Sequence, residues 1–251
     1  MTKQIFHWHR FTDPQAFYPF AGKIFPWAWA LAVVFGVVGL SVGLLFAPTD
    51  AQQGETYRII FLHVPTSWMS IFVYLVMAFL AGLGLAYNLR LLGMMVQALA
   101  PTGALFAFLS LWTGALWGKP TWGTYWVWDA RLTSELILLF LYLGFIALQS
   151  AIDDSRRADR AGAILLLVGV ANIPIIYFSV KWWNTLHQGA SISIVRSPSM
   201  ETTMLAGILL CTSACLMYAI AVALMRARNI MLERERRTEW VHGELLREER
   251  K

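Results

Sequence analysis

The sequence has few charged residues and few cysteines. Only 14% of its 251 residues are charged, against about 25% in ordinary soluble domains, while 58% are hydrophobic. Cys211 and Cys215 are the only cysteines, and they lie four residues apart inside an apolar run. We therefore expect both to be buried structural residues, and the absence of C-x-x-C and C-x-x-C-H excludes those redox and attachment motifs. The G-x-S-x-G, H-E-x-x-H and P-loop motifs are also absent.

Long apolar runs are abundant. Six of them are long enough, or nearly so, to cross a bilayer as a helix, which takes about 20 apolar residues. The first run is too long for a secretory signal, and 23 residues precede it. The sequence therefore predicts an all-α, polytopic membrane protein with six transmembrane helices, in which Pro101 and Pro174 cause kinks rather than breaks. The expected spans are Ile24–Ala47, Ile59–Tyr87, Leu91–Trp117, Thr133–Gln149, Ala161–Val180 and Thr202–Met225.

The basic residues predict the orientation of these spans. Fifteen of the 20 Lys and Arg residues fall on the side of the N-terminus, and five fall on the other side. The positive-inside rule therefore places both termini in the cytoplasm, where the whole net charge of +5 then lies. Nucleic-acid binding is not needed to explain that charge. We expect a six-span membrane domain over residues 1–225 and a charged cytoplasmic tail over 226–251, either solvated beside lipid headgroups or docked to a partner.

Tryptophan is concentrated in one outer connection, residues 118–133, and just before it. Five tryptophans lie within 17 residues: Trp112, Trp117, Trp122, Trp126 and Trp128. An aromatic belt at the membrane interface is one interpretation. If the segment is helical, four side chains share one face: Trp122, Tyr125, Trp126 and Asp129. That face would be a flat aromatic platform ending in a carboxylate, with Arg131 close by, and it suits a large planar ligand with anionic groups.

Two histidines flank this segment on the outer side. His63 begins the second span and His187 lies in the last outer connection, whereas His7, His9 and His242 fall on the cytoplasmic side. A lone histidine is usually a hydrogen-bonded structural residue, but neutral imidazole is also a common metal ligand, and haem iron accepts histidine on one or both faces. Zinc is less well supported, because it needs three or four protein ligands and the outer side offers no further His or Cys.

Glu135 is a separate candidate near the outer end of the fourth span. An ionisable group at the membrane edge is a functional candidate by default. The alternative is a structural salt bridge to Arg131, one helical turn earlier.

The run from Trp122 to Thr133 matches a known signature without a departure. It reads W-G-x-x-W-x-W-D-x-R-L-T and resembles the tryptophan-rich (WWD) haem-handling family. The segments RIIFLHVPTSW around His63 and WWNTLHQGAS around His187 resemble one branch of it, the haem exporter protein C branch of the cytochrome c maturation system. The chain is too short for the larger relatives that perform the ligation step.

The resemblance implies a specific function and site. Members of this branch hold haem b at the periplasmic face of the bacterial inner membrane and pass it to a periplasmic membrane-anchored haem chaperone. They act with an ABC-type ATPase, a second membrane subunit and a small single-span subunit, and they are not enzymes. Carried over, His63 and His187 are the axial ligands of the haem iron. The same resemblance assigns the platform and its polar rim to Trp122, Trp126, Trp128, Asp129 and Arg131.

Three other classes of protein compete with this prediction. A b-type electron-transfer protein would keep its haem permanently, and such proteins usually carry paired histidines within the spans. A membrane enzyme, such as a haem-modifying lyase, should carry a nucleophile or an acid–base pair, and only Glu135 is available. A structural subunit of a membrane transporter complex is compatible with haem binding.

Overall fold

The computed structural model describes residues 12–183, 185–187 and 199–248, and within them every regular element is a helix. This confirms the all-α prediction. The elements in chain order are α1 (Pro14–Ser41), the π-helix η2 (Val42–Phe46), the 3-10 helix η3 (Glu55–Ile59), α2 (Ile60–Tyr87), α3 (Arg90–Trp122), α4 (Ala130–Ala151), α5 (Ser155–Gly169), α6 (Asn172–Trp182), α7 (Thr202–Arg234) and α8 (Glu239–Glu248).

Six helical segments are long and apolar enough to cross a membrane, as predicted. They are Pro14–Phe46, Glu55–Tyr87, Arg90–Trp122, Ala130–Ala151, Ser155–Trp182 and Thr202–Arg234. The first starts ten residues before the expected Ile24, because Asp13 caps the helix by accepting from the Gln15 amide and Pro14 occupies the first turn. The last extends nine residues beyond Met225, through arginines that favour helix but not hydrocarbon.

The connection between α3 and α4 is not helical, so residues 122–129 do not form the single face that a helix would have given them. Gly123 has a φ of 80°, a left-handed conformation that ends α3. Asp129 then caps α4, because its Oδ1 accepts from the Leu132 amide at 2.8 Å. The intervening residues, 123–129, cross the end of the bundle as an irregular segment.

Pro174 interrupts its span rather than only bending it. Since proline has no N–H, the Val170 carbonyl loses its usual helical partner and accepts from the Ile173 amide instead, at 3.0 Å. The chain tightens there, and α5 and α6 become two helices within one span. Pro101, in contrast, lies inside the uninterrupted helix α3.

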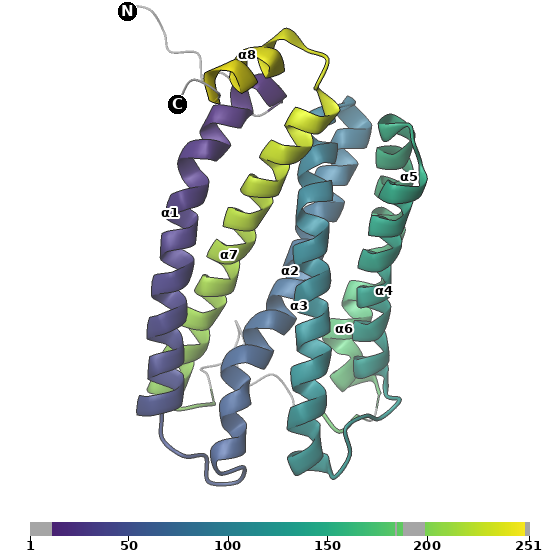
Figure 1. Cartoon of the computed structure of the whole chain (residues 1–251). Coiled ribbons are helices and arrows are strands. Elements are labelled where there is room, and N and C mark those ends of the chain that lie inside the picture. The colour runs from purple at the N-terminus through teal and green to yellow at the C-terminus, as the bar shows by residue number, and fades with distance from the viewer. Residues whose placement is uncertain (1–11, 184, 188–198, 249–251) are drawn as a thin grey trace, which may run out of the picture.

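The spans run up and down as an elongated bundle (Figure 1). α1 and α7 pack side by side along their length, α2 and α3 form the centre, and α4 with α5 and α6 covers the other side. We call the end that carries residues 47–59, 118–133, 185–187 and 199–201 the site end, and the opposite end, which carries α8, the tail end. Helix α8 folds back onto α1, where the Trp240 and Tyr18 rings lie 5.6 Å apart and Val241 is buried. The described part of the tail is therefore largely helical, and it is not fully solvated.

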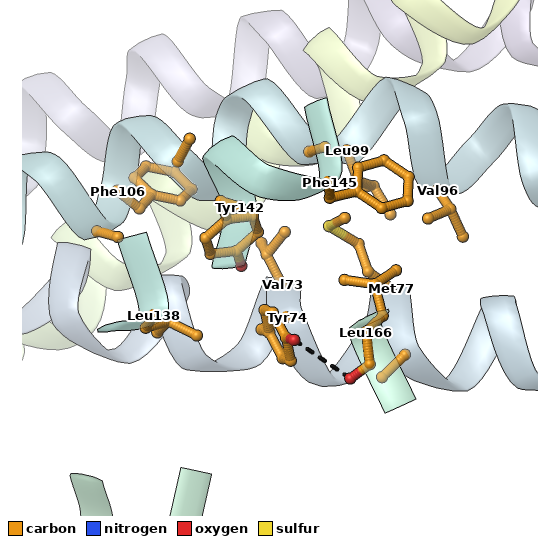
Figure 2. Close-up of a cluster of buried hydrophobic side chains, with 14 of the residues drawn as sticks. Val73, Tyr74, Met77, Val96, Leu99, Phe106, Leu138, Tyr142, Phe145 and Leu166 are labelled. Atoms are coloured by element: carbon orange, nitrogen blue, oxygen red, sulfur yellow. Dashed lines mark hydrogen bonds between the residues drawn. The ribbon is translucent and has the colours of Figure 1, made fainter. Parts of the chain in front are cut away.

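The largest buried cluster fills the middle of the bundle where α2, α3, α4 and α5 meet (Figure 2). Tyr74 and Tyr142 are fully buried and meet edge to face at 5.3 Å. Each phenol finds a backbone acceptor: Tyr74 donates to the Leu166 carbonyl at 3.2 Å and Tyr142 to the Ser70 carbonyl at 2.7 Å. These bonds satisfy polar atoms that would otherwise be costly inside a membrane protein. They also fix α2 against α4 and α5 directly beneath the site end.

Candidate functional site

His63 lies in the first turn of α2 and points against α3. Its Nδ1 is 3.1 Å from the Ser110 carbonyl oxygen and 3.1 Å from the Thr113 hydroxyl. The carbonyl can only accept, and the Thr113 hydroxyl already donates to the Leu109 carbonyl at 2.6 Å. Nδ1 therefore carries the proton, and Nε2 keeps its free lone pair. Gly114 provides the space, since a Cβ there would lie 3.0 Å from the Cε1 atom of His63.

The carboxylate of Asp129 holds the His187 ring. Its Nδ1 lies 3.4 Å from Oδ2 of Asp129 and 3.3 Å from the Thr185 hydroxyl, which also accepts from the His187 amide at 2.9 Å. The Trp122 ring packs against the imidazole with centroids 4.7 Å apart. A carboxylate that accepts from Nδ1–H again leaves Nε2 as the free atom. Asp129 thus caps α4 with one oxygen and orients His187 with the other.

The surroundings favour a neutral His187 imidazole and a charged Asp129 carboxylate. Burial lowers the pKa of His187 below its ordinary value, and nearby Arg131 acts in the same direction, while Asp129 opposes them. Burial acts to raise the pKa of Asp129, but the bonds from Leu132 and Thr185 and the interaction with His187 outweigh it, so that pKa is lowered. At neutral pH the imidazole is neutral and the carboxylate is charged, which is the state in which histidine binds a metal.

The last turns of α3 bring the two histidines into one region. Trp117 packs edge-on against His63 at 5.6 Å, and five residues later Trp122 packs against His187. Five residues span about 7.5 Å along a helix. The two imidazoles and Arg131 are also close enough to interact electrostatically. Two histidines that are far apart in the sequence therefore lie in one region at the site end.

The tryptophans of the segment 118–133 do not form one flat surface. Trp126 and Trp128 meet at 5.2 Å with their planes 77° apart, and Trp128 is 77% exposed. The indole Nε1 of Trp126 is buried and has no hydrogen-bond partner among the residues that the structure describes. A buried donor without a partner costs free energy, and such groups deserve a functional explanation. Tyr125, placed by the helical prediction on the same face, is exposed and lies beneath Lys119, whose Nζ is 5.3 Å from the ring centroid.

Arg131 and Glu135 do not form the salt bridge considered from their spacing. Arg131 donates through Nη1 to the Ile176 carbonyl on α6 at 2.6 Å. Glu135 is buried between α2, α3 and α4, where its Oε1 accepts from the Ser70 hydroxyl at 2.8 Å. Both residues therefore make bonds between helices rather than one within α4.

Some parts of the site were not predicted from the sequence. Ser110, Thr113 and Thr185 hold the imidazoles, and Gln53 accepts from the Trp117 indole at 2.7 Å. The spacing of Thr113 and Trp117 at i and i+4 could have placed both on the helix face that meets His63. His7 and His9 lie outside the described residues. His242 lies on α8 at the tail end and is exposed. Among the described residues, no group of three His, Cys, Asp or Glu could hold a metal ion by itself.

Comparison with known proteins places the chain in a family. The family model described as "Heme exporter protein C" matches residues 7–242. The proteins named "Heme exporter protein C" from Escherichia coli K12 and Haemophilus influenzae are each 47% identical to this chain. These alignments cover 97% and 93% of this chain, and 98% and 95% of those proteins, respectively. A "Putative cytochrome c biosynthesis ccmC-like mitochondrial protein" from Marchantia polymorpha is 43% identical over 78% of this chain and 82% of its own length. The chain therefore belongs to the heme exporter protein C family.

Proposed function

We propose that this protein binds haem b at the site end and passes it to a periplasmic membrane-anchored haem chaperone, as the haem-exporting step of cytochrome c maturation. His63 and His187 are the axial ligands. The site end faces the periplasm, the tail end and both termini face the cytoplasm, and the membrane is the bacterial inner membrane. The names of the relatives support haem export and cytochrome c biosynthesis as the process. The distribution of Lys and Arg supports the orientation.

The observation that carries this proposal is that both imidazoles are hydrogen-bonded through the same ring nitrogen, Nδ1. Both are engaged at Nδ1 by acceptors, and neither Nε2 has a hydrogen-bond partner among the described residues. Metal-binding histidines almost always donate their other ring N–H to a carboxylate or a backbone carbonyl, which fixes the tautomer and raises the basicity of the ligand nitrogen. Here one histidine has the carbonyl and the other has the carboxylate.

The remaining residues fit a planar ligand with acidic groups. Trp117 and Trp122 supply apolar ring surface next to the two imidazoles. The Nε1–H of Trp126, which has no partner within the described part of the chain, can donate to a carboxylate, and Arg131 uses only Nη1 in its bond to Ile176. Arginine has five N–H donors, so this guanidinium can also pair with a propionate. Trp122, Trp126, Trp128, Asp129 and Arg131 thus line the proposed haem site, with Asp129 acting through His187.

The position of the histidines distinguishes a carrier from the other candidates. Both imidazoles lie at the end of the bundle, whereas a permanent electron-transfer haem is usually buried between paired histidines within the spans. Two histidine ligands would fill both axial positions of the iron and leave none open for oxygen chemistry. We therefore propose a non-enzymatic carrier that acts with an ABC-type ATPase, a second membrane subunit and a small single-span subunit, within the lipid bilayer and without nucleic acid.

Absorption spectra of the detergent-purified protein test this proposal. The wild type, expressed with and without its chaperone, should show a low-spin Soret band that is stronger when the chaperone is absent. His63→Ala and His187→Ala should each alter the spectrum and reduce the haem content by at least about tenfold. His242→Ala, an exposed histidine at the tail end, is the matched control and should leave the spectrum unchanged. A wild-type protein that folds but stays colourless with ample haem would refute haem binding and favour the structural-subunit interpretation.

A further inference from the structure

A buried polar cluster lies directly beneath His63 and is not used by the proposed haem site. We define the serine–glutamate cluster as Ser67 and Ser70 on α2, Ser110 on α3 and Glu135 on α4. All four are buried, with side chains between 0% and 8% exposed. An ionisable residue in this position is costly, because a membrane helix bundle offers little water to solvate it. A cluster of this kind therefore calls for a role that apolar packing could not fill.

The cluster is a continuous set of contacts that leads from Glu135 to His63. Ser70 donates to Oε1 of Glu135 at 2.8 Å, and the Ser67 and Ser110 hydroxyls lie 2.5 Å apart. The Ser110 side chain is a further polar neighbour of the Glu135 carboxyl group. The Ser110 carbonyl is in turn the acceptor for Nδ1 of His63, at 3.1 Å. Glu135 thus reaches the histidine through a single residue of α3.

Ser110 links the cluster to the histidine because it bonds α2 twice. Its backbone oxygen accepts from His63, and its hydroxyl pairs with Ser67, one helical turn further along the same face of α2. Two bonds at one residue fix both the rotation and the axial position of α3 relative to α2. Glu135 adds the third helix, since it bonds Ser70 from α4. A shift of α3 by a few tenths of an ångström would lengthen the bond to Nδ1.

The cluster could instead serve only to hold the three helices together. Hydrogen bonds between membrane helices stabilise bundles only modestly. The Tyr142 phenol of α4 already bonds the Ser70 carbonyl of α2, and the Asn172 side chain of α6 already bonds the Ser134 carbonyl, so α4 is connected to its neighbours without Glu135. What these other bonds do not provide is a connection to the acceptor of His63.

We propose that Glu135 is a positioning residue for His63, acting through Ser70, Ser67 and Ser110. It holds the Ser110 carbonyl where it accepts from Nδ1–H and so keeps the Nε2 lone pair of His63 directed into the site. The inference rests on the proposed function in one respect, because it takes His63 to be a haem ligand. The placing of the imidazole itself can be measured without haem.

The test combines a haem-free and a haem-bound measurement on the full-length protein. In the haem-free protein labelled with ¹⁵N-histidine, His63 is assigned by its loss in His63→Ala and should show the Nδ1–H tautomer. Glu135→Leu and Ser110→Ala should give mixed tautomers or broadened His63 signals, whereas Glu135→Gln, which can still bond the serines, should restore the wild-type signals. Haem affinity should fall about tenfold in Glu135→Leu and in Ser110→Ala, at the low end of the effect of removing a ligand's hydrogen-bond partner.

Ser134→Ala is the matched control. Ser134 is as buried as Ser110 and precedes Glu135, but its hydroxyl bonds only the Ala130 and Arg131 carbonyls of its own helix. Its loss should change neither the His63 signals nor haem affinity. Unchanged His63 signals in both Glu135→Leu and Ser110→Ala would overturn the positioning role, whatever happens to thermal stability. Unchanged haem binding in His63→Ala would instead refute the proposed ligand, while the ¹⁵N signals would still decide the role of Glu135.

Discussion

The two histidines of the site make the same bond with different partners. His63 belongs to a long helix, and its Nδ1 meets a backbone carbonyl and a threonine on a neighbouring helix. His187 lies in a connection, and its Nδ1 meets a carboxylate and a threonine two residues away. The acceptor of His63 belongs to the backbone, so a substitution at position 110 can displace this oxygen but cannot remove it. His187 depends on one side chain, Asp129, and a single substitution can change it.

Among substitutions that act on only one of the two histidines, Asp129→Asn is expected to cause the largest loss of haem affinity. Asparagine caps helices as well as aspartate, so α4 should still begin at Ala130. The amide lacks the charge that supports Nδ1–H of His187, and loss of such a partner typically lowers metal affinity about 10- to 100-fold. We expect a loss of haem affinity in this range, measured by haem titration.

Asp154→Asn is the matched control for this change. Asp154 caps α5 at the tail end by accepting from the Arg157 amide at 2.8 Å, as Asp129 does for Leu132. Its substitution should not affect haem. Equal losses in the two variants would show that capping, rather than the orientation of His187, is the important role of Asp129.

A smaller effect is expected from Gly114→Ala, which acts on His63. The added Cβ would lie 3.0 Å from Cε1 of the imidazole, so the ring has to move. Mild overpacking costs about 1 kcal/mol, which corresponds to about a fivefold loss of haem affinity. Gly82→Ala on α2 is the control, since its Cβ would meet Leu167 at an ordinary 3.6 Å. Affinity is measured by the same titration. An unchanged affinity in Gly114→Ala would show that the contact between residue 114 and the imidazole does not affect the ligand nitrogen.

The smallest effect is expected from pH in the neutral range. Burial lowers the pKa of His187 below its ordinary value of about 6.5, and protonation competes with iron for the imidazole. Affinity should therefore change by less than about 1.3-fold between pH 7 and 8.5, and fall as the pH drops through the lowered pKa. Haem titrations across this range, with NMR titration of His187 in the haem-free protein, measure both quantities. A pKa of His187 above that of histidine in a free peptide would contradict the prediction that this ligand is neutral at pH 7.

Much of the fold could be predicted from the sequence, because a bilayer imposes length and hydropathy on each span. All six spans were found, but their ends were less accurate. The polar first turns of α1 and the arginine-rich end of α7 are helical without being apolar, so hydropathy alone missed them. The break before Pro174 was expected to be only a kink, since the sequence does not reveal which backbone groups find new partners.

The main candidate residues of the site could be identified in the sequence, but their arrangement in space could not. Periodicity allowed a helix through Trp126 as one possibility, although Gly123 and Asp129 are the usual stop and start signals for helices. The partners of His63 come from α3, 47 and 50 residues further along the chain, and no local pattern connects them. The role of Asp129 beside His187 was also missed, since it depends on how a connection folds over the end of the bundle.

The pairing of α1 with α7 has a consequence for how the protein assembles. α1 packs mainly against α7, which follows four other spans along the chain. The Arg228 side chain of α7 lies 3.8 Å above the Tyr18 ring and donates to the Tyr18 carbonyl at 3.0 Å. When the ribosome has delivered α1 to the bilayer, the surface that α7 will cover still faces lipid. The first span can therefore complete its packing only when the sixth span has been inserted, by which time nearly the whole membrane domain is in the bilayer.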